Sequence, residues 1–517
     1  MQNYHLQVYF LALLENQLIN YFLSKAKKVT FILHFAFCIL HLPTISRGKH
    51  KMFNTEFDTI AAISTPQGKG GVALIRISGP SANAVGDRIF KRINGRSVSD
   101  TQPRMAAFGE IVNPIDGRRV DTGLCTRFAA PNSFTGEDTV EICCHGGILV
   151  TRAVLSAALA AGARRAEAGE FTRRAFAAGK LSLSEAEALG MLLDAGTEAQ
   201  LKLSRGGMSG ALSTACDGLR REITTLLEDI YARVDFPEED LGSISDDEVL
   251  SRLSALIASA KKLSATYSTG RAVAEGIPTV ICGRTNAGKS TLYNLLVGSD
   301  EAIVTDIEGT TRDILTATVS FGDVTLLLSD TAGLRKTSEE VERIGIRRAE
   351  EKIDSAELVF FLVDSSRTPS EDDITLAERL TSHSGKVIAV LTKSDLERNE
   401  DAVALASRFE LNVTLSVKSG SGCDELESLV NRLFLDGELD TERDAVISSA
   451  RQHDALLRVI DALDEALSSL NDGFPPDVAG VCLEDAAARL CELDGRGAGA
   501  VGADIADGIF SRFCVGK

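Results

Sequence analysis

Apolar residues follow two different spacings along the chain, and the changes between them divide the sequence. Two stretches place apolar side chains every three or four residues, as one buried face of an α-helix requires. They are Leu219, Ile223, Leu226, Ile230 and Val234, and Leu456, Ile460, Leu463, Leu467 and Leu470. Between them lie short apolar runs of strand length, at 278–282, 324–328, 358–363, 386–391 and 412–415. This pattern predicts one helical domain that is interrupted by an inserted α/β domain.

A further α/β domain is predicted before the helices, because the apolar runs at 59–63 and 72–77 have strand character and are joined by a glycine-rich turn. The expected fold class is α/β plus all-α. Its N-terminal domain would span 52–172, the two parts of the helical domain 173–271 and 438–517, and the inserted domain 272–437. A length of 517 residues agrees with about three domains of ordinary size.

The first 51 residues differ from the rest of the chain. They hold eight of the 28 Phe and Tyr residues and a formal charge of +5, in a chain whose total charge is -18. Their longest apolar run, at 31–42, is too short to cross a bilayer, which takes about 20 residues per helix. We expect residues 1–51 to be non-native or disordered sequence, with Met52 as the true start. The alternative is a targeting or membrane-associating extension.

Composition narrows the class of protein. Charged residues at 25% and a glycine count of 44 are ordinary globular values, which exclude a collagen-like or low-complexity chain. Ten scattered cysteines without a CxxC pair exclude a disulfide scaffold and favour a reducing, cytoplasmic location. Because the net charge is -18, contact with RNA would need local basic patches, such as the one formed by Arg164, Arg165, Arg173 and Arg174.

A phosphate-binding loop is predicted at the start of the inserted domain. The segment Gly283-Arg-Thr-Asn-Ala-Gly-Lys-Ser290 fits the pattern G-x-x-x-x-G-K-[ST] and lies between a predicted strand and a predicted helix. Its backbone N–H groups can approach the phosphates, Lys289 can reach the β and γ oxygens, and the Ser290 hydroxyl can bind Mg²⁺. The same site would be lined by Asn286, Ala287, Gly288 and Thr291.

Later strand ends indicate which base is bound. The run at 324–328 is followed by Asp330-Thr331-Ala332-Gly333, which places a carboxylate near Mg²⁺ and an N–H near the γ-phosphate. The run at 386–391 is followed by Thr392-Lys393-Ser394-Asp395. Asp395 can accept hydrogen bonds from N1 and N2 of guanine, which adenine cannot supply. Ser416, Val417 and Lys418 would complete the base pocket.

This set of motifs resembles the translation-factor-like GTPases over about 160 residues. Thr392 stands where that class usually has Asn, so we expect guanine affinity to be reduced without being lost.

GTP hydrolysis needs a group that orients the attacking water. Ras-like enzymes use a Gln directly after this glycine, but here the residue after Gly333 is Leu334, so another part of the chain must supply the group. Asn286 and the segment Thr305-Asp306-Ile307-Glu308-Gly309-Thr310-Thr311 are rich in oxygen ligands. They could hold a monovalent cation in place of an arginine finger, which is worth about 10³ to 10⁵ in rate. Thr311 would be the second Mg²⁺ ligand. Glu342 is a candidate for orienting the water, and a solvated surface Glu is the alternative.

Two segments of the N-terminal domain carry charges beside apolar strands, Pro131–Ile142 and Gly169–Phe176. They indicate either a polar ligand site or salt bridges at strand ends. The residues alone leave both possibilities open.

Taken together, the three domains and the last residues, Ile509–Lys517, resemble the tRNA-modifying GTPase family MnmE, also called TrmE, from about residue 58 to residue 517. The terminal Phe-Cys-Val-Gly-Lys is the most specific match, with Val515 in place of the commoner Ile. The resemblance implies an N-terminal α/β folate-binding and dimerisation domain, a split helical domain and an inserted Ras-like P-loop GTPase domain.

The resemblance also implies an activity. The family hydrolyses GTP with K⁺ and Mg²⁺ and acts as a homodimer, in a heterotetramer with a FAD-containing flavoprotein of the MnmG/GidA type. The complex transfers a one-carbon unit from 5-formyl- or 5,10-methylene-tetrahydrofolate to C5 of the wobble uridine of certain tRNAs. An aminomethyl or carboxymethylaminomethyl group results.

Individual residues acquire roles by the same resemblance. The folate contacts would be Arg76, Glu141, Lys180 and Lys517, and the K⁺ ligands Asn286, Thr305, Ile307 and Thr310. Glu342 would be the water-orienting acid. Cys514 either takes part in the modification reaction or is an inert thiol.

Two other classes of protein share parts of this pattern. A ribosome-assembly or other switch GTPase has no reason to carry the N-terminal domain or the terminal motif. A plain folate-dependent aminomethyltransferase has no reason to carry the complete set of GTPase motifs.

Overall fold

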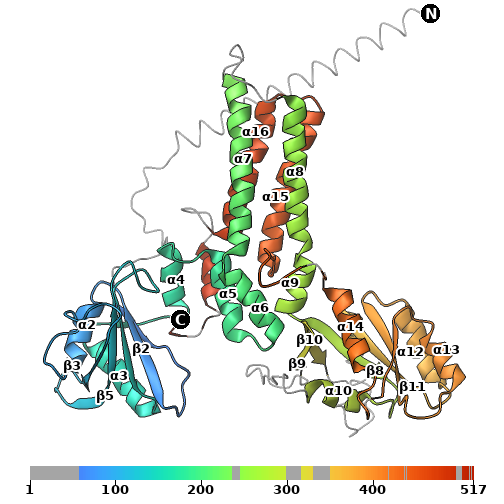
Figure 1. Cartoon of the computed structure of the whole chain (residues 1–517), viewed down its shortest axis with the longest axis horizontal. Coiled ribbons are helices and arrows are strands. Elements are labelled where there is room, and N and C mark those ends of the chain that lie inside the picture. The colour runs from blue at the N-terminus through green and yellow to red at the C-terminus, as the bar shows by residue number, and fades with distance from the viewer. Residues whose placement is uncertain are drawn as a thin grey trace, which may run out of the picture. The chain divides into compact units, whose positions relative to one another are not determined.

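The computed structural model describes residues 58–235, 245–298, 316–329, 350–416, 418–435, 437, 439–495, 503–511, 513 and 515–516 (Figure 1). The predictions about residues 1–51 therefore lie outside the described residues. Within the described ranges, every helix is too short or too polar to cross a bilayer.

The first part of the described chain is a seven-stranded sheet with the strand order β3-β4-β5-β6-β2-β1-β7. The strands are β1 (Ile60–Ile63), β2 (Val72–Ser78), β3 (Phe90–Arg92), β4 (Ala106–Val112), β5 (Arg119–Phe128), β6 (Thr139–His145) and β7 (Arg164–Arg165). All neighbours pair antiparallel except β1 and β7. The two strands predicted at 59–63 and 72–77 are confirmed as β1 and β2.

Two helices, α2 (Ala82–Ile89) and α3 (Ile148–Ala160), pack on this sheet. Successive side chains of a strand point to opposite faces. In β2, Ala73, Ile75 and Ile77 therefore enter the same hydrophobic core as the two helices. Arg76 lies on the other face of the sheet and is only partly buried. A polar residue in the middle of an apolar strand is thus placed away from the core.

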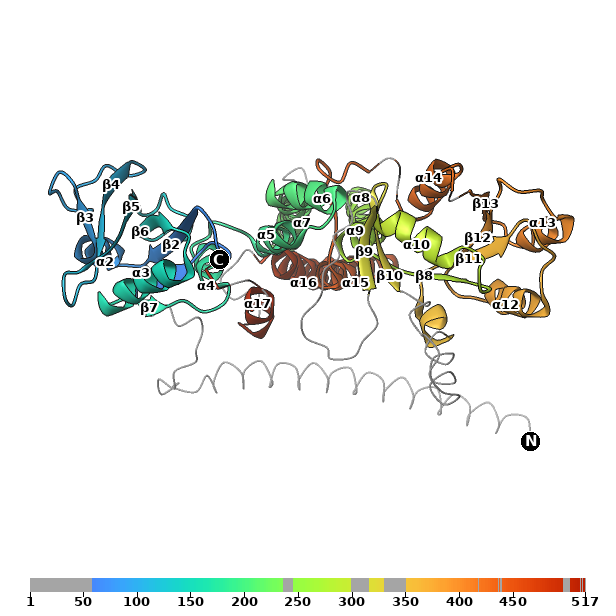
Figure 2. The same cartoon turned by 90° about the horizontal axis from the view of Figure 1, so that it is seen from below.

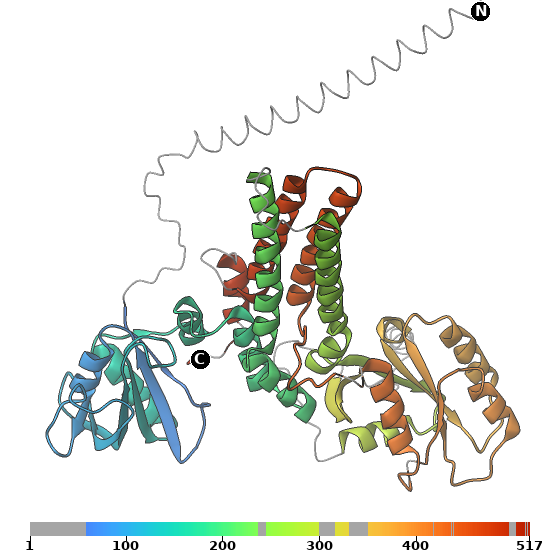
Figure 3. The same ribbon diagram turned by 45° about the horizontal axis from the view of Figure 1, so that its top comes forward.

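The next part is helical. Its helices are α4 (Glu170–Ala177), α5 (Leu183–Asp194), α6 (Glu198–Met208), α7 (Ala211–Asp235), α8 (Asp246–Ala265), α9 (Tyr267–Ala274), α15 (Ala450–Asn471), α16 (Pro476–Asp494) and α17 (Ala503–Phe510). Figures 1 and 3 show α7, α8, α15 and α16 side by side. One core contains most of the predicted apolar positions, namely Leu219, Ile223, Leu226 and Ile230 of α7 and Leu456, Ile460 and Leu463 of α15, and Leu467 and Leu470 are packed against it. The helical stripes predicted from sequence are therefore confirmed as two halves of one bundle.

The part of the chain that lies, in sequence, between the two halves of the bundle forms a six-stranded sheet with the strand order β13-β12-β11-β8-β10-β9. Its strands are β8 (Ile277–Gly283), β9 (Thr316–Phe321), β10 (Val324–Ser329), β11 (Leu358–Asp364), β12 (Lys386–Thr392) and β13 (Asn412–Thr414), and the helices are α10 (Lys289–Val297), α12 (Glu371–Thr381), α13 (Glu400–Ala406) and α14 (Cys423–Phe434). The strands are parallel except β9. Every strand predicted in this region is confirmed.

This sheet has a hydrophobic core on each face. One core contains residues of α10 and α14, and the other contains residues of α12 and α13 (Figure 2). In β11, Phe360 and Leu362 enter the first core, and Val359, Phe361 and Val363 enter the second. A strand buried on both faces reads as an unbroken apolar run, which is what the sequence contains here.

The chain enters and leaves this α/β part through one small hydrophobic cluster. Val273 of α9 packs there with Ala199 and Leu203 of α6 and with Val446. Leu435, which follows α14, is packed against the same cluster. The two ends of the inserted part are therefore held together on the bundle.

Candidate functional site

The predicted phosphate-binding loop joins β8 to α10. Gly283 has φ 137°, and a Cβ at this position would lie 2.5 Å from the carbonyl oxygen of Leu362. Only glycine fits such a close approach of two strands. Asn286 has φ 68°, a left-handed conformation that Asn tolerates better than most residues. Gly288 precedes α10 as its N-cap, so the free N–H groups of the first helical turn open onto the loop.

Lys289 crosses this loop. Its Nζ donates hydrogen bonds to the carbonyl oxygens of Gly283, at 2.7 Å, and Arg284, at 2.9 Å. Burial lowers the pKa of Lys289 below its ordinary value of 10.5. An anionic phosphate at the loop would favour the charged amine and offset this effect. Ser290 and Thr291 lie next to it and are exposed.

Thr392 ties the end of β12 to the loop. It is 1% exposed, and its Oγ1 donates to the carbonyl oxygens of Ala287, at 2.8 Å, and Val363, at 3.3 Å. The residue that departs from the usual pattern thus packs beneath the phosphate loop. Its hydroxyl supplies a hydrogen bond that connects the segment predicted to bind the base with the predicted phosphate-binding loop.

The other residues of the predicted base pocket converge at the same edge of the sheet. Ser416 Oγ donates to Asp395 Oδ1 at 2.9 Å. Lys393 Nζ lies 2.5 Å from Asp364 Oδ2 at the end of β11. Burial alone would raise the pKa of Asp364, but the hydrogen bonds from Lys393 and Ser366 hold it below its ordinary value. The structure therefore brings together three segments, 283–290, 392–395 and 416, that are far apart in sequence.

Several predicted residues lie outside the described ranges. They are Thr305, Asp306, Ile307, Glu308, Gly309, Thr310, Thr311, Asp330, Thr331, Ala332, Gly333, Glu342, Val417, Cys514 and Lys517. Lys418 is described and is exposed.

A second polar site lies on the first sheet, away from α2 and α3. Arg76 of β2 and Glu141 of β6 are register partners, and Arg76 Nε lies 2.8 Å from Glu141 Oε1. The rings of Phe134 and Phe171 lie 5.2 Å and 5.7 Å from the guanidinium carbon, which are cation–π distances. The two residues predicted to contact folate are thus ion-paired with each other between aromatic rings.

Two further predicted contacts lie near this sheet. Lys180 is exposed and packs beside Gly136. At the C-terminus, Val515 forms an antiparallel bridge with Ala168, and Ser64 Oγ donates to the carbonyl oxygen of Gly516 at 3.0 Å. Val515 and Gly516 are thus held against the N-terminal domain.

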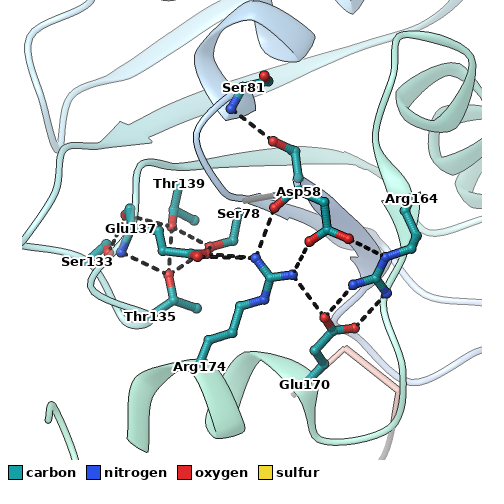
Figure 4. Close-up of polar contacts among 11 residues, drawn as sticks. Asp58, Ser78, Ser81, Ser133, Thr135, Glu137, Thr139, Arg164, Glu170 and Arg174 are labelled. Carbon is teal, nitrogen blue, oxygen red and sulfur yellow. Dashed lines mark hydrogen bonds and ion pairs between the residues drawn. The ribbon is translucent and has the colours of Figure 1, made fainter. Parts of the chain in front are cut away.

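An ionic network joins α4 to this domain (Figure 4). Glu170, 2% exposed, receives hydrogen bonds from Arg164 and from Arg174, and both arginines also bond Asp58. Arg174 donates in addition to Glu137. Burial alone would raise the pKa of Glu170, but these hydrogen bonds hold it below 4.5.

This network bears on two of the sequence predictions. Arg164 and Arg174 are ion-paired with carboxylates of the chain itself, which neutralises part of the charge of the patch formed by Arg164, Arg165, Arg173 and Arg174, and RNA contact by this patch stays a prediction. Charged residues of segments 131–142 and 169–176 form salt bridges, as one alternative proposed, and the other alternative, a polar ligand site, stays a prediction. Nothing local in the sequence could identify the partners, because Asp58 and Arg174 are 116 positions apart.

A glycine loop that joins a parallel strand to a helix, with Thr392 at the end of β12 hydrogen-bonded to it, is typical of a P-loop protein. Comparison with known proteins agrees with this class. The profile described as "MnmE helical domain" matches residues 183–514, and that described as "GTP-binding protein TrmE N-terminus" matches residues 59–180. The chain belongs to the tRNA modification GTPase MnmE family, and the resemblance noted in the sequence is confirmed.

Individual relatives match nearly end to end. The tRNA modification GTPase MnmE of Acetivibrio thermocellus is 36% identical over 462 residues, which cover 89% of this chain and 99% of the relative. The protein of the same name from Lactobacillus delbrueckii subsp. bulgaricus is 38% identical over 464 residues, 90% of this chain and 99% of the relative. The solved structure of Aquifex aeolicus Era bound to GDP and AlF4⁻ is 20% identical, covers 36% of this chain and 65% of its own, and has a TM-score of 0.25, from which we conclude nothing.

Proposed function

We propose that this protein couples K⁺- and Mg²⁺-dependent GTP hydrolysis to tRNA modification. With a FAD-dependent partner of the MnmG/GidA type, it would add an aminomethyl or carboxymethylaminomethyl group to C5 of the wobble uridine of certain tRNAs. A tetrahydrofolate derivative would donate the one-carbon unit. The protein would act in the cytoplasm as a homodimer within a heterotetramer. The observation that carries this proposal is the presence of two separate polar sites on one chain, the phosphate loop and the Arg76–Glu141 pair.

The geometry of the first site supports GTP as the nucleotide. The Asp395 carboxylate is held by Ser416 and keeps acceptor capacity for the N1 and N2 donors of guanine. An adenine base carries no N–H donor at N1 or C2, so it would not form these two hydrogen bonds with the carboxylate. Thr392 holds the two halves of the pocket in register through its bond to Ala287.

The donor set of the loop fits the two proposed cations. Ser290 offers a hydroxyl oxygen at the start of α10, which suits Mg²⁺. Asn286 is exposed at the loop and offers an amide oxygen, which suits a larger monovalent ion. Thr311 would complete the Mg²⁺ site, and Thr305, Ile307 and Thr310 would complete the K⁺ site. Glu342 would orient the attacking water.

The chemistry of the second site fits a reduced folate. Arg76 offers a cation for a carboxylate or a pterin oxygen, and Glu141 offers an acceptor for the N–H groups of an aminopyrimidine. Phe134 supplies a partly exposed ring beside them, on which a flat heterocycle can pack. Lys180 and Lys517 would add positive charge, and Cys514 would either take part in the modification reaction or be an inert thiol.

We assign one role to each of the three predicted domains. Residues 52–172 would bind folate and another copy of the chain, 272–437 would bind GTP, and 173–271 with 438–517 would join them.

Calorimetry with 5-formyl-tetrahydrofolate tests the folate part. We expect the full-length chain to bind, and Arg76→Ala to lose binding because the cation of the pair is removed. Arg165→Ala is the matched control, since Arg165 is an exposed arginine of the same domain. Unchanged affinity in Arg76→Ala would place the folate site elsewhere.

Nucleoside mass spectrometry tests the whole proposal. A strain that lacks the protein should lose the wobble-uridine modification, and the wild-type chain should restore it. Complementation by Arg76→Ala should fail. Normal modification in the deletion strain would refute the proposed function.

A further inference from the structure

Two aromatic rings flank Arg76, and they are held in place by different means. Phe171 belongs to α4, is 0% exposed, and packs in a small core with Ile60 and Ala62. Phe134 belongs to residues 129–138, which we call the Phe134 loop, and its side chain is 37% exposed. Because hydrophobic burial fixes Phe171 but only partly covers Phe134, the position of Phe134 depends on the polar contacts of its loop.

One polar contact of the Phe134 loop reaches α4, while Thr135, 2.7 Å from Ser78 through the hydroxyl oxygens, and Asp138, bonded by Asn83 and by the N–H of Gly79, hold the loop to α2 and the end of β2. Arg174 Nη1 donates to Glu137 Oε1 at 3.1 Å and to Oε2 at 3.2 Å, as Figure 4 shows. Glu137 Oε2 also accepts from Ser78 Oγ at 2.8 Å. Both partners of Glu137 are thus anchored, one on α4 and one at the end of β2, and the loop is closed over the face of β2 that carries Arg76.

Arg174 itself has little freedom to move. Its side chain is 12% exposed, and its Nη2 donates to Asp58 Oδ1 at 2.6 Å and to Glu170 Oε1 at 2.9 Å. Burial alone would lower the pKa of Arg174, but its carboxylate partners raise it above the ordinary value. The guanidinium is therefore a permanently charged, rigid anchor for the loop.

We propose that Arg174 is a positioning residue of the ligand site. By holding Glu137, it keeps Phe134 beside Arg76 and so determines how tightly the Arg76–Glu141 pair binds a reduced folate, without touching the ligand. This inference rests on the proposed function. A loop that moves freely would present Phe134 in the binding position only part of the time, and the apparent affinity would fall by that fraction.

The absence of tryptophan from the chain allows a direct measurement of the loop. Phe134→Trp introduces a single tryptophan, whose emission maximum and acrylamide quenching report exposure of the loop in the ligand-free protein. In this background, Arg174→Gln and Glu137→Ala should each shift the emission to the red and increase quenching. The double variant should match the single ones, because both substitutions break the same contact.

Arg164→Gln is the matched control. Arg164 shares Asp58 and Glu170 with Arg174 and is equally charged, but its contacts do not include Glu137. It should leave the tryptophan signal unchanged, even if the thermal midpoint falls. A shift in Arg164→Gln as large as that in Arg174→Gln would mean that the network stabilises the domain as a whole, and would overturn the inference.

Affinity is then measured in the full-length chain with native Phe134. We expect Arg174→Gln and Glu137→Ala to weaken binding of 5-formyl-tetrahydrofolate at least about tenfold, and Arg164→Gln to weaken it by less than about twofold. If Arg174→Gln does not fold, Glu137→Ala decides, because it leaves the bonds of Arg174 to Asp58 and Glu170 in place.

The outcomes separate the two claims. If the wild-type chain binds the folate and Arg174→Gln and Glu137→Ala bind it equally well, the inference is wrong and the proposed function stands. If the wild-type chain does not bind the folate at all, the proposed function is wrong.

Discussion

Thr392 offers a direct test of how the base-binding segment and the phosphate loop are connected. Thr392→Val keeps the branched shape of the side chain but removes the hydroxyl that donates to Ala287 at 2.8 Å and to Val363 at 3.3 Å. At 1% exposure, water cannot replace this donor, so the carbonyl oxygen of Ala287 loses a partner. The loop should then be held less firmly against β12.

The size of the effect follows from the cost of an unsatisfied buried acceptor, which is about 1 to 3 kcal/mol. If all of it falls on nucleotide binding, the affinity for GDP decreases by about 5- to 150-fold, since about 1.4 kcal/mol corresponds to a factor of ten. If the loop is equally well ordered without nucleotide, the same loss is seen instead as a lower thermal midpoint of the ligand-free protein.

The assay therefore combines calorimetry with GDP and thermal unfolding without nucleotide. Thr392→Ser is the control, because it retains the hydroxyl and should stay near wild type in affinity. Thr392→Asn restores the residue usual in this class and should bind at least as tightly as wild type. A Thr392→Val variant with wild-type affinity and a wild-type thermal midpoint would refute the reasoning.

Three further predictions address the chemistry of the sites. Asp395→Asn should reduce GTP affinity at least about tenfold, because the carboxylate that accepts from N1 and N2 of guanine is lost; equal GTP affinity in competition binding would contradict the assignment of the pocket. Replacing K⁺ by Na⁺ should slow GTP hydrolysis at least about tenfold, since the cation stands in for an arginine finger, and Asn286→Ala should remove the difference. Equal wild-type rates in the two salts would contradict the cation site. Because the folded pKa of Glu170 lies below 4.5, its contribution to stability is complete above pH 4.5 and is lost as the pH falls through the folded value. Unfolding by urea at pH 3 to 7 should therefore show a steeper acid loss in wild type than in Glu170→Gln, and parallel curves would show that Glu170 is not the responsible group.

Much of the fold could be predicted from local patterns. The apolar runs at 278–282 and 358–363 are strands, and the glycine motif at 283–290 lies between a strand and a helix, as predicted. These features could be predicted because an apolar run and a glycine motif depend only on neighbouring residues. The division of the bundle could also be predicted, since a 3.6-residue period appears on both sides of the α/β region.

The pairing of charged residues could not be predicted in the same way. Arg76 and Glu141 carry opposite charges, but their contact depends on the register of β2 with β6. Arg164 and Arg174 have the composition of a basic patch, and only the fold shows that Glu170 and Asp58 neutralise them. The sequence shows that Thr392 departs from a motif. Its hydrogen bond to Ala287 could not be predicted, because the two residues are 105 positions apart.

The cluster where the chain enters and leaves the GTP-binding part has an evolutionary consequence. Val273 and Leu435 pack in the same hydrophobic cluster. The stretch between them is therefore equivalent to one long insertion at the surface of the bundle. A domain whose two ends lie close together can be gained by a host fold without disturbing the core of that fold. Among the residues that the structure describes, none of the inserted part belongs to the bundle core that contains Ile223 and Leu456. Ancestral or engineered chains that join Val273 to Leu435 by a short turn are therefore expected to retain a folded bundle.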